Sequence, residues 1–186
     1  MGPCKAKQCP STRCEQATAE RPAGRTLGRM DDDPEGTALG LYRLADADPE
    51  EPPGPHELAS RLGLTITYST GWSPGDASLV RLRGQWQILV RRRLSPEREV
   101  WAVSHELAEW ALRREPPSED RERAATELAA RILMPRPAFR QLVRAVGLDL
   151  EALAAPWPTT QTAAALRYLE VTDTPGVVVT PTSIRH

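Results

Sequence analysis

The sequence is poor in histidine, with only His56, His105 and the final residue, His186, among 186 residues. Any metal site or imidazole-based catalysis must draw on these three side chains. Cysteine is equally scarce, because all three cysteines lie in the first fourteen residues and form no CxxC pair. This pattern indicates neither a zinc knuckle nor an even set of disulfides, and it is typical of a reducing cytosol.

Long apolar runs and an excess of one charge are also missing. No stretch approaches the roughly 18 apolar residues of a membrane span, and no apolar segment follows the first basic residues as in a secretion signal. The 24 lysines and arginines nearly balance the 25 acidic residues, for a net charge of −1. This balance gives no case for wholesale binding to nucleic acid or to an acidic membrane. We expect a cytoplasmic protein without membrane attachment or direct nucleic-acid binding.

The composition, 40% hydrophobic and 26% charged, fits one globular domain with ragged ends. Residues 1–30 are basic and nearly devoid of large apolar side chains, which predicts a disordered tail. Residues 31–54 form an acidic segment with a short helix, capped by Asp33 with Pro34 in its first position, and a proline-rich linker. The main folded domain is expected to span residues 55–186.

Within that domain the hydrophobic periodicity predicts an α+β fold in which a small, mainly antiparallel sheet packs on a helical bundle. Helix caps and proline breaks mark the helix ends, whereas alternation of apolar and polar residues marks the strands. The expected helices cover 56–62, 96–112, 118–133, 139–146 and 160–169. The expected strands cover 64–68, 79–82 and 86–90. Residues 176–179 are expected to form either a last strand or a packed extended tail.

The helix over 96–112 is apolar nearly all round in its second half, so its few polar residues need an explanation. His105 and Glu109 are four residues apart, which places them on one face, roughly 6 Å apart, where both can bind one ion. Glu106 points about 100° away around the axis. In HExxH helices, the glutamate at that position acts on water bound to the metal.

The next helix offers a second acidic group, because Glu122 heads an apolar stripe formed by Ala125, Leu128, Ala129, Ile132 and Leu133. A loop of about five residues forces the two helices to pack together, so one histidine and two glutamates can converge. A divalent cation would relieve the repulsion between such carboxylates. The alternative is a structural ion-pair network of His105, Glu109 and Glu122 with Arg113 or Arg123.

The run from about Leu58 to Leu169, roughly 110 residues, resembles the ImmA/IrrE family of metallopeptidases. The matching pieces are Leu58-Ala59-Ser60-Arg61-Leu62-Gly63-Leu64-Thr65-Ile66, Ile88-Leu89-Val90, Val103-Ser104-His105-Glu106-Leu107 and the alanine-rich helix from Glu122 to Met134-Pro135. The resemblance implies a compact gluzincin-like, or zincin, fold for residues 55–186. It also implies that His105 and Glu122 are zinc ligands and that Glu106 is the general base acting on a metal-activated water.

The chain departs from the family pattern at Glu109, where members of the HExxH type have a histidine, so it carries an HExxE variant in which Glu109 is the expected third ligand. One neutral imidazole and two carboxylates leave a divalent site formally neutral, whereas two imidazoles and one carboxylate leave it at +1. The metal is then less electrophilic, and oxygen-rich ligation relaxes the preference for Zn²⁺ toward harder divalent ions such as Mn²⁺.

Members of this family act on regulatory proteins, often repressors of mobile elements or stress genes. The resemblance therefore implies a zinc-type endopeptidase acting on a regulatory protein, which an exposed edge of the 64–90 sheet would hold as an added strand. The alternative is a catalytically weak or inactive relative that acts by binding a regulator. A DNA-binding regulator reading bases through Gln161 and Arg167 ranks below both.

Overall fold

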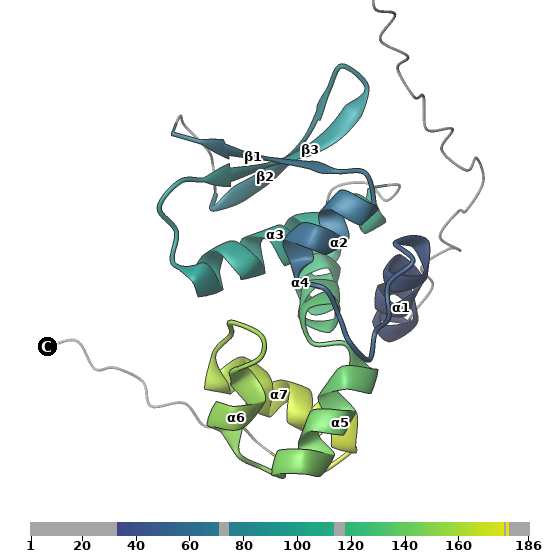
Figure 1. Cartoon of the computed structure of the whole chain (residues 1–186), viewed down its shortest axis with the longest axis vertical. Coiled ribbons are helices and arrows are strands. Elements are labelled where there is room, and N and C mark those ends of the chain that lie inside the picture. The colour runs from purple at the N-terminus through teal and green to yellow at the C-terminus, as the bar shows by residue number, and fades with distance from the viewer. Residues whose placement is uncertain (1–32, 71–74, 114–117, 177, 179–186) are drawn as a thin grey trace, which may run out of the picture.

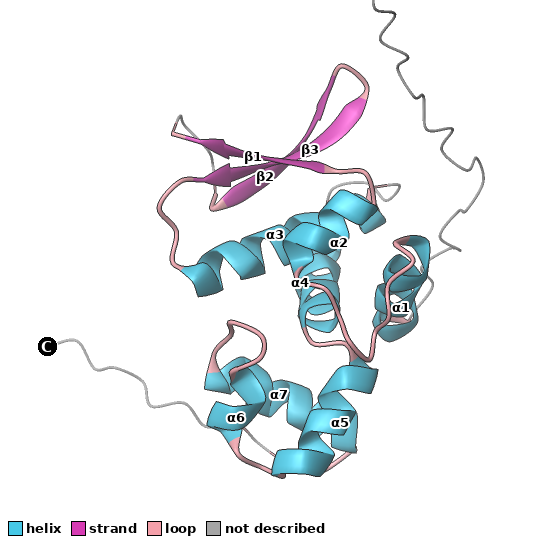
Figure 2. Ribbon diagram, in the orientation of Figure 1, coloured by secondary structure: helices cyan, strands magenta, loops and turns pink. Residues whose placement is uncertain are grey.

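The computed structural model describes residues 33–70, 75–113, 118–176 and 178, and it confirms the α+β class (Figures 1 and 2). The expected tail over 1–30 and residues 177 and 179 of the expected last strand lie outside the described residues. In chain order the elements are α1 (Pro34–Leu44), α2 (Pro55–Arg61), β1 (Thr65–Ser69), β2 (Ala77–Leu82), β3 (Gln85–Arg91), α3 (Pro96–Leu112), α4 (Glu119–Leu133), α5 (Arg136–Val146), α6 (Leu150–Ala154) and α7 (Gln161–Thr172).

The sheet has the strand order β1-β3-β2, and it is mixed rather than mainly antiparallel. Strands β2 and β3 form the expected antiparallel hairpin, joined at Arg83 and Gly84, which both have the positive φ that a two-residue hairpin turn requires. Strand β1 instead pairs with β3 in parallel. Because β3 lies between the other two strands, β1 and β2 are both edge strands, and each leaves one row of backbone groups unpaired within the sheet.

Helix α3 forms the centre of the molecule, between the sheet and the C-terminal helices (Figure 1). It packs most extensively on α4 and also contacts β2, β3 and α2. Helix α1 lies against α4 in the same hydrophobic core, where the Tyr42 hydroxyl donates to the Ile132 carbonyl at 2.7 Å. The acidic segment thus contributes a helix to the main core instead of standing apart from it.

A second cluster of buried apolar residues joins α5, α6 and α7 around Phe139, which stacks on Trp157 with ring centroids 5.6 Å apart. Helix α5 begins three residues earlier than expected because Pro137 occupies its first turn, where the missing N–H costs nothing. The break between α4 and α5 therefore falls at Pro135, and Pro137 belongs to α5. Helix α6 was not expected, and α7 begins after its Thr160 cap and runs three residues beyond the expected end.

The hypothesis that α7 reads DNA loses Arg167, one of its two candidate base contacts. This side chain is only 3% exposed, and its guanidinium donates to the Met134 carbonyl at 2.9 Å and to Glu35 at 2.7 Å. A third bond, to Glu170 at 3.0 Å, completes the set. Arg167 therefore ties α7 to α1 and is not available to contact a base.

None of the described helices is both long and apolar enough to cross a membrane.

Candidate metal centre

Helix α3 positions three of the candidate side chains and satisfies its own polar groups. Ser95 caps the helix by accepting a hydrogen bond from the Arg98 amide, and Pro96 occupies the first position, as the sequence predicts. Ser104 is fully buried, and its hydroxyl donates to the Val100 carbonyl at 2.9 Å. The other polar residues in the buried half of this helix are His105, Glu106 and Glu109, and all three line one pocket.

Helix α4 brings Glu122 to the same place. Ser118 caps this helix by accepting from the Arg121 amide at 3.1 Å, so that Glu122 falls in the first turn. The five apolar residues of its stripe are buried as predicted. The Glu122 side chain, however, is 67% exposed. Its Oε1 nevertheless lies 3.2 Å from Nε2 of His105.

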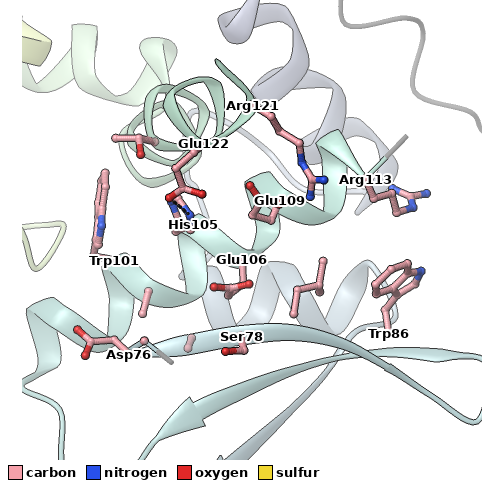
Figure 3. Close-up of a pocket in the computed structure, with 15 residues that line it drawn as sticks. Asp76, Ser78, Trp86, Trp101, His105, Glu106, Glu109, Arg113, Arg121 and Glu122 are labelled. Carbon is pink, nitrogen blue, oxygen red and sulfur yellow. Dashed lines mark hydrogen bonds and ion pairs between the residues drawn. The ribbon is translucent and has the colours of Figure 1, made fainter. Parts of the chain in front are cut away.

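The predicted cluster is present: His105, Glu109 and Glu122 each offer one ligand atom, and these atoms all lie within 4.8 Å of one another. An imidazole nitrogen and two carboxylate oxygens form a donor set that suits a borderline or hard divalent cation. The chemistry of these residues thus fits a metal ion. Figure 3 shows the cluster at the junction of α3 and the start of α4.

The cluster lies in a pocket of about 810 Å³ between β2, α3 and the first turns of α4. Ala77, Ser78 and Leu79 of the edge strand β2 form one wall, and Trp86 and Trp101 add apolar surface. In Figure 3, Glu106 lies between α3 and the strand that carries Ser78, below Glu109 and Glu122. The pocket therefore combines an edge strand, a group of possible metal ligands and a separate carboxyl group.

Glu106 has the most perturbed environment of these carboxyl groups. It is only 9% exposed, and burial raises its pKa from the ordinary 4.5 to about 7. The negative charges of Glu109 and Glu122 contribute to this rise, whereas a hydrogen bond from the Leu79 backbone N–H opposes it. A carboxyl group with a pKa near 7 can both accept and release a proton at neutral pH, which suits a general base.

Glu109 forms an ion pair with Arg121, whose guanidinium NH2 contacts its Oε2. Both side chains are largely buried, at 15% and 16% exposed. The sequence had suggested Arg113 or Arg123 for such a pairing. Instead, Arg123 pairs with Asp120 at the surface, and the guanidinium of Arg113 lies over the Trp110 ring, 4.2 Å from its centroid.

A model of the IrrE N-terminal-like domain, a peptidase family of the ImmA/IrrE group, matches residues 59–168. The chain belongs to this family. It is therefore related to metallopeptidase-like proteins, as the motifs around His105 and Glu122 indicated. No curated protein matches the chain.

The fold of this IrrE-like protein is similar to that of a solved structure described as a Mycobacterium tuberculosis transcriptional regulator. The TM-score is 0.53 at 13% sequence identity, and the similarity covers 74% of this chain and 46% of the regulator. The chain thus spans less than half the length of that protein. At this identity the likeness concerns the fold alone.

His56 does not supply the second imidazole of an HExxH site in this IrrE-like chain. It lies in the first turn of α2, where its Nε2 is 2.9 Å from Oε1 of Glu99. The Tyr68 hydroxyl donates to the same oxygen at 2.6 Å. His56 is not among the residues that line the pocket, which leaves His105 as its imidazole.

Sequence reasoning did not identify Arg121 as a residue of the site. A signal was present, because Arg121 directly precedes Glu122 and lies three residues after the Ser118 cap, so its side chain starts from the same helix end. Strand β2 was expected to contribute to the site only through the edge of the sheet. The hydrogen bond from its Leu79 amide to Glu106 was not predicted.

Proposed function

We propose that this IrrE-like protein is a metal-dependent, zinc-type endopeptidase that acts in the cytoplasm on a regulatory protein such as a repressor. One observation carries the proposal: His105, Glu109 and Glu122 converge beside the buried Glu106 in a pocket walled by an edge strand. Such a pocket combines a metal-type donor set, a base and a place for an extended peptide.

His105, Glu109 and Glu122 would hold the ion, for which Zn²⁺ is the first candidate and Mn²⁺ the second, given two oxygen donors. When bound, a divalent ion supplies Lewis acidity that activates water and polarises a carbonyl group. All three residues line the pocket, and Glu122 is 67% exposed. This exposure supports a site that substrate can reach.

Glu106 is proposed as the catalytic base. The carboxylate takes a proton from the attacking water and returns it to the leaving amine as the peptide bond breaks. The Leu79 N–H holds the carboxyl group in place, and burial keeps its pKa near neutrality, so both transfers are accessible at neutral pH. No cation is paired directly with Glu106 in the described hydrogen bonds or ion pairs, which favours proton transfer over a structural salt bridge.

The substrate is proposed to bind as an added strand along β2. The N–H of Leu79 is directed to Glu106 rather than to β3, so the free side of this strand faces the candidate site. An extended segment of a target protein can form backbone hydrogen bonds along such an edge. Trp86 and Trp101 offer apolar surface for its side chains.

The first experiment is metal analysis of the purified full-length protein, followed by a cleavage assay on a peptide library read by mass spectrometry. We expect about one equivalent of divalent metal, the capacity of a single three-ligand site. The variant Glu106→Gln should keep the metal and lose cleavage. Glu127→Gln, which changes an exposed glutamate on α4, is the matched control and should behave as wild type. A well-folded protein that binds no metal refutes the proposal.

The second candidate function is a binding protein that retains the fold and regulates a partner without cleaving it. The ion pair between Arg121 and Glu109 favours this alternative, because it satisfies one of the candidate ligands without a metal. The two functions separate on one result. If the regulatory effect of the protein survives Glu106→Gln, the function is binding. If this effect is lost while the variant still binds its partner, the function is cleavage.

A further inference from the structure

We propose that Arg121 is a built-in counter-charge of the candidate metal centre: its guanidinium binds Glu109 and offsets the negative charge that this glutamate adds. This inference rests on the proposed metal site. It concerns what allows one histidine and two glutamates to hold a divalent ion there. The observation behind it is the largely buried Arg121–Glu109 ion pair in the wall of the same pocket.

The position of Arg121 links it to the cluster rather than to the surface. It lies next to Glu122 in the first turn of α4, yet its side chain reaches Glu109 on α3. Arg123, two residues further along the same helix, has a side chain that is 69% exposed and pairs with Asp120. Of these two arginines, only Arg121 places its positive charge in contact with a candidate ligand.

The charge balance explains why such a residue is useful. Glu109 and Glu122 carry two negative charges, and Arg121 returns one positive charge, so with a neutral His105 the group has a net charge of −1. A donor set of two histidines and one glutamate, which catalytic zinc sites use, has the same net charge. With a divalent ion bound, both arrangements therefore stand at +1. Arg121 thus gives the HExxE cluster the overall charge of a two-histidine site.

A carboxylate can serve both partners, because its two oxygens provide about four acceptor positions. Arg121 contacts Oε2 of Glu109, which leaves further lone pairs on this residue for an ion. The guanidinium has a cost, however. A positive charge beside the cluster repels a second cation, so Arg121 should hold the affinity for divalent ions below what the bare carboxylates would give.

The test measures dissociation constants of Zn²⁺ and Mn²⁺ for the full-length protein by competition with a chromophoric chelator. Removing the charge in Arg121→Met should tighten the binding of both ions by about tenfold or more, the scale on which one charge within about 4–6 Å changes ionic equilibria. Arg121→Lys keeps the charge and should stay within about threefold of wild type. Arg123→Met removes the same charge outside the pocket, and its affinity should equal that of wild type.

Because Arg121→Met leaves Glu109 without this partner in a largely buried position, its fold is checked by circular dichroism and thermal unfolding. Arg121→Gln is the second variant, since an amide still donates a hydrogen bond to Glu109 without carrying a charge. A residue with a merely structural role would lower the melting temperature of the variants without tightening the binding of metal.

The outcomes separate this inference from the proposed function. If wild type binds one equivalent of metal and the Arg121 variants bind it equally or more weakly, the counter-charge is refuted and the metal site stands. If only the charge-removing variants bind metal, Arg121 blocks the site instead of balancing its charge, and both the counter-charge and the proposed function are refuted. If none of the proteins binds Zn²⁺ or Mn²⁺, both ideas are refuted.

Discussion

Replacing Glu106 with glutamine should change the free energy of unfolding by an amount that depends on pH. In the chelator-treated protein, this change is expected to be about 3 kcal/mol more stabilising at pH 8 than at pH 4. Burial raises the pKa of Glu106 from 4.5 to about 7, so the folded chain holds this proton more tightly than the unfolded chain does. The contribution of the protonated group to stability is complete below pH 4.5. It is lost as the pH rises to 7 and above, because ionisation then favours the unfolded state.

The magnitude follows from the two pKa values. Each tenfold difference in proton affinity is worth about 1.36 kcal/mol, so a rise from 4.5 to about 7 corresponds to about 3 kcal/mol. Glutamine has no proton to lose, and its own packing effect is the same at both pH values. The change in the stability difference between pH 4 and pH 8 therefore isolates the ionisation of Glu106.

The assay is urea unfolding of the wild type and the variant in EDTA at pH 4, 6 and 8, followed by circular dichroism. Glu127→Gln serves as the control, because it removes a carboxylate that solvent already surrounds. A stability difference between Glu106→Gln and wild type that stays constant across this pH range would refute the reasoning. It would mean that the ionised carboxylate of Glu106 is as well solvated in the folded chain as in the unfolded one.

Three further predictions concern other parts of the molecule. Glu109→His combined with Arg121→Met should raise both the affinity for Zn²⁺ and the rate of peptide hydrolysis, since the pair gives the site a second imidazole and removes the cation that Glu109 would otherwise leave unpaired; calorimetry and the library assay measure these, and a gain in neither means that the site lies elsewhere. Arg167→Met should cost about 3–5 kcal/mol of unfolding free energy by leaving the half-buried Glu35 without its closest cation, whereas a loss below about 1 kcal/mol would show that solvent screens Glu35. Tyr42→Phe should cost about 0.5–1.5 kcal/mol through the lost bond to the Ile132 carbonyl, as chemical denaturation can show, and an unchanged midpoint would contradict the bond.

The sequence predicted those features that depend on local spacing. Ser95 and Ser118 were expected to cap helices, and each accepts the predicted kind of hydrogen bond, whereas Asp33, also expected as a cap, makes no such side-chain bond. The convergence of His105 and Glu109 follows from helical periodicity, and the apolar stripe of α4 placed Glu122 near them. Such features are set by a few consecutive residues, so no knowledge of distant contacts is needed.

Features that depend on distant contacts were missed. The parallel pairing of β1 with β3 is not encoded in either strand alone, since alternation defines which face is buried but not which neighbour is chosen. Tyr68 shows the same limit: the pattern predicted a buried side chain, but the structure leaves it 43% exposed, where it binds Glu99 of α3. The pairing of Arg121 with Glu109 likewise depends on how α4 crosses α3, which residue spacing does not determine.

The carboxylates of Glu106, Glu109 and Glu122 share one pocket, where they would repel one another, and each of them has different surroundings. Glu122 stays exposed to water, which screens its charge. Glu109 is largely buried but paired with Arg121. Glu106 is buried, none of the described ion pairs joins it to a cation, and its pKa rises to about 7. The paired Glu109 and the exposed Glu122 thus have surroundings that suit their proposed role as ligands. With a pKa near 7, Glu106 can exchange a proton at neutral pH, which supports its proposed role as the base.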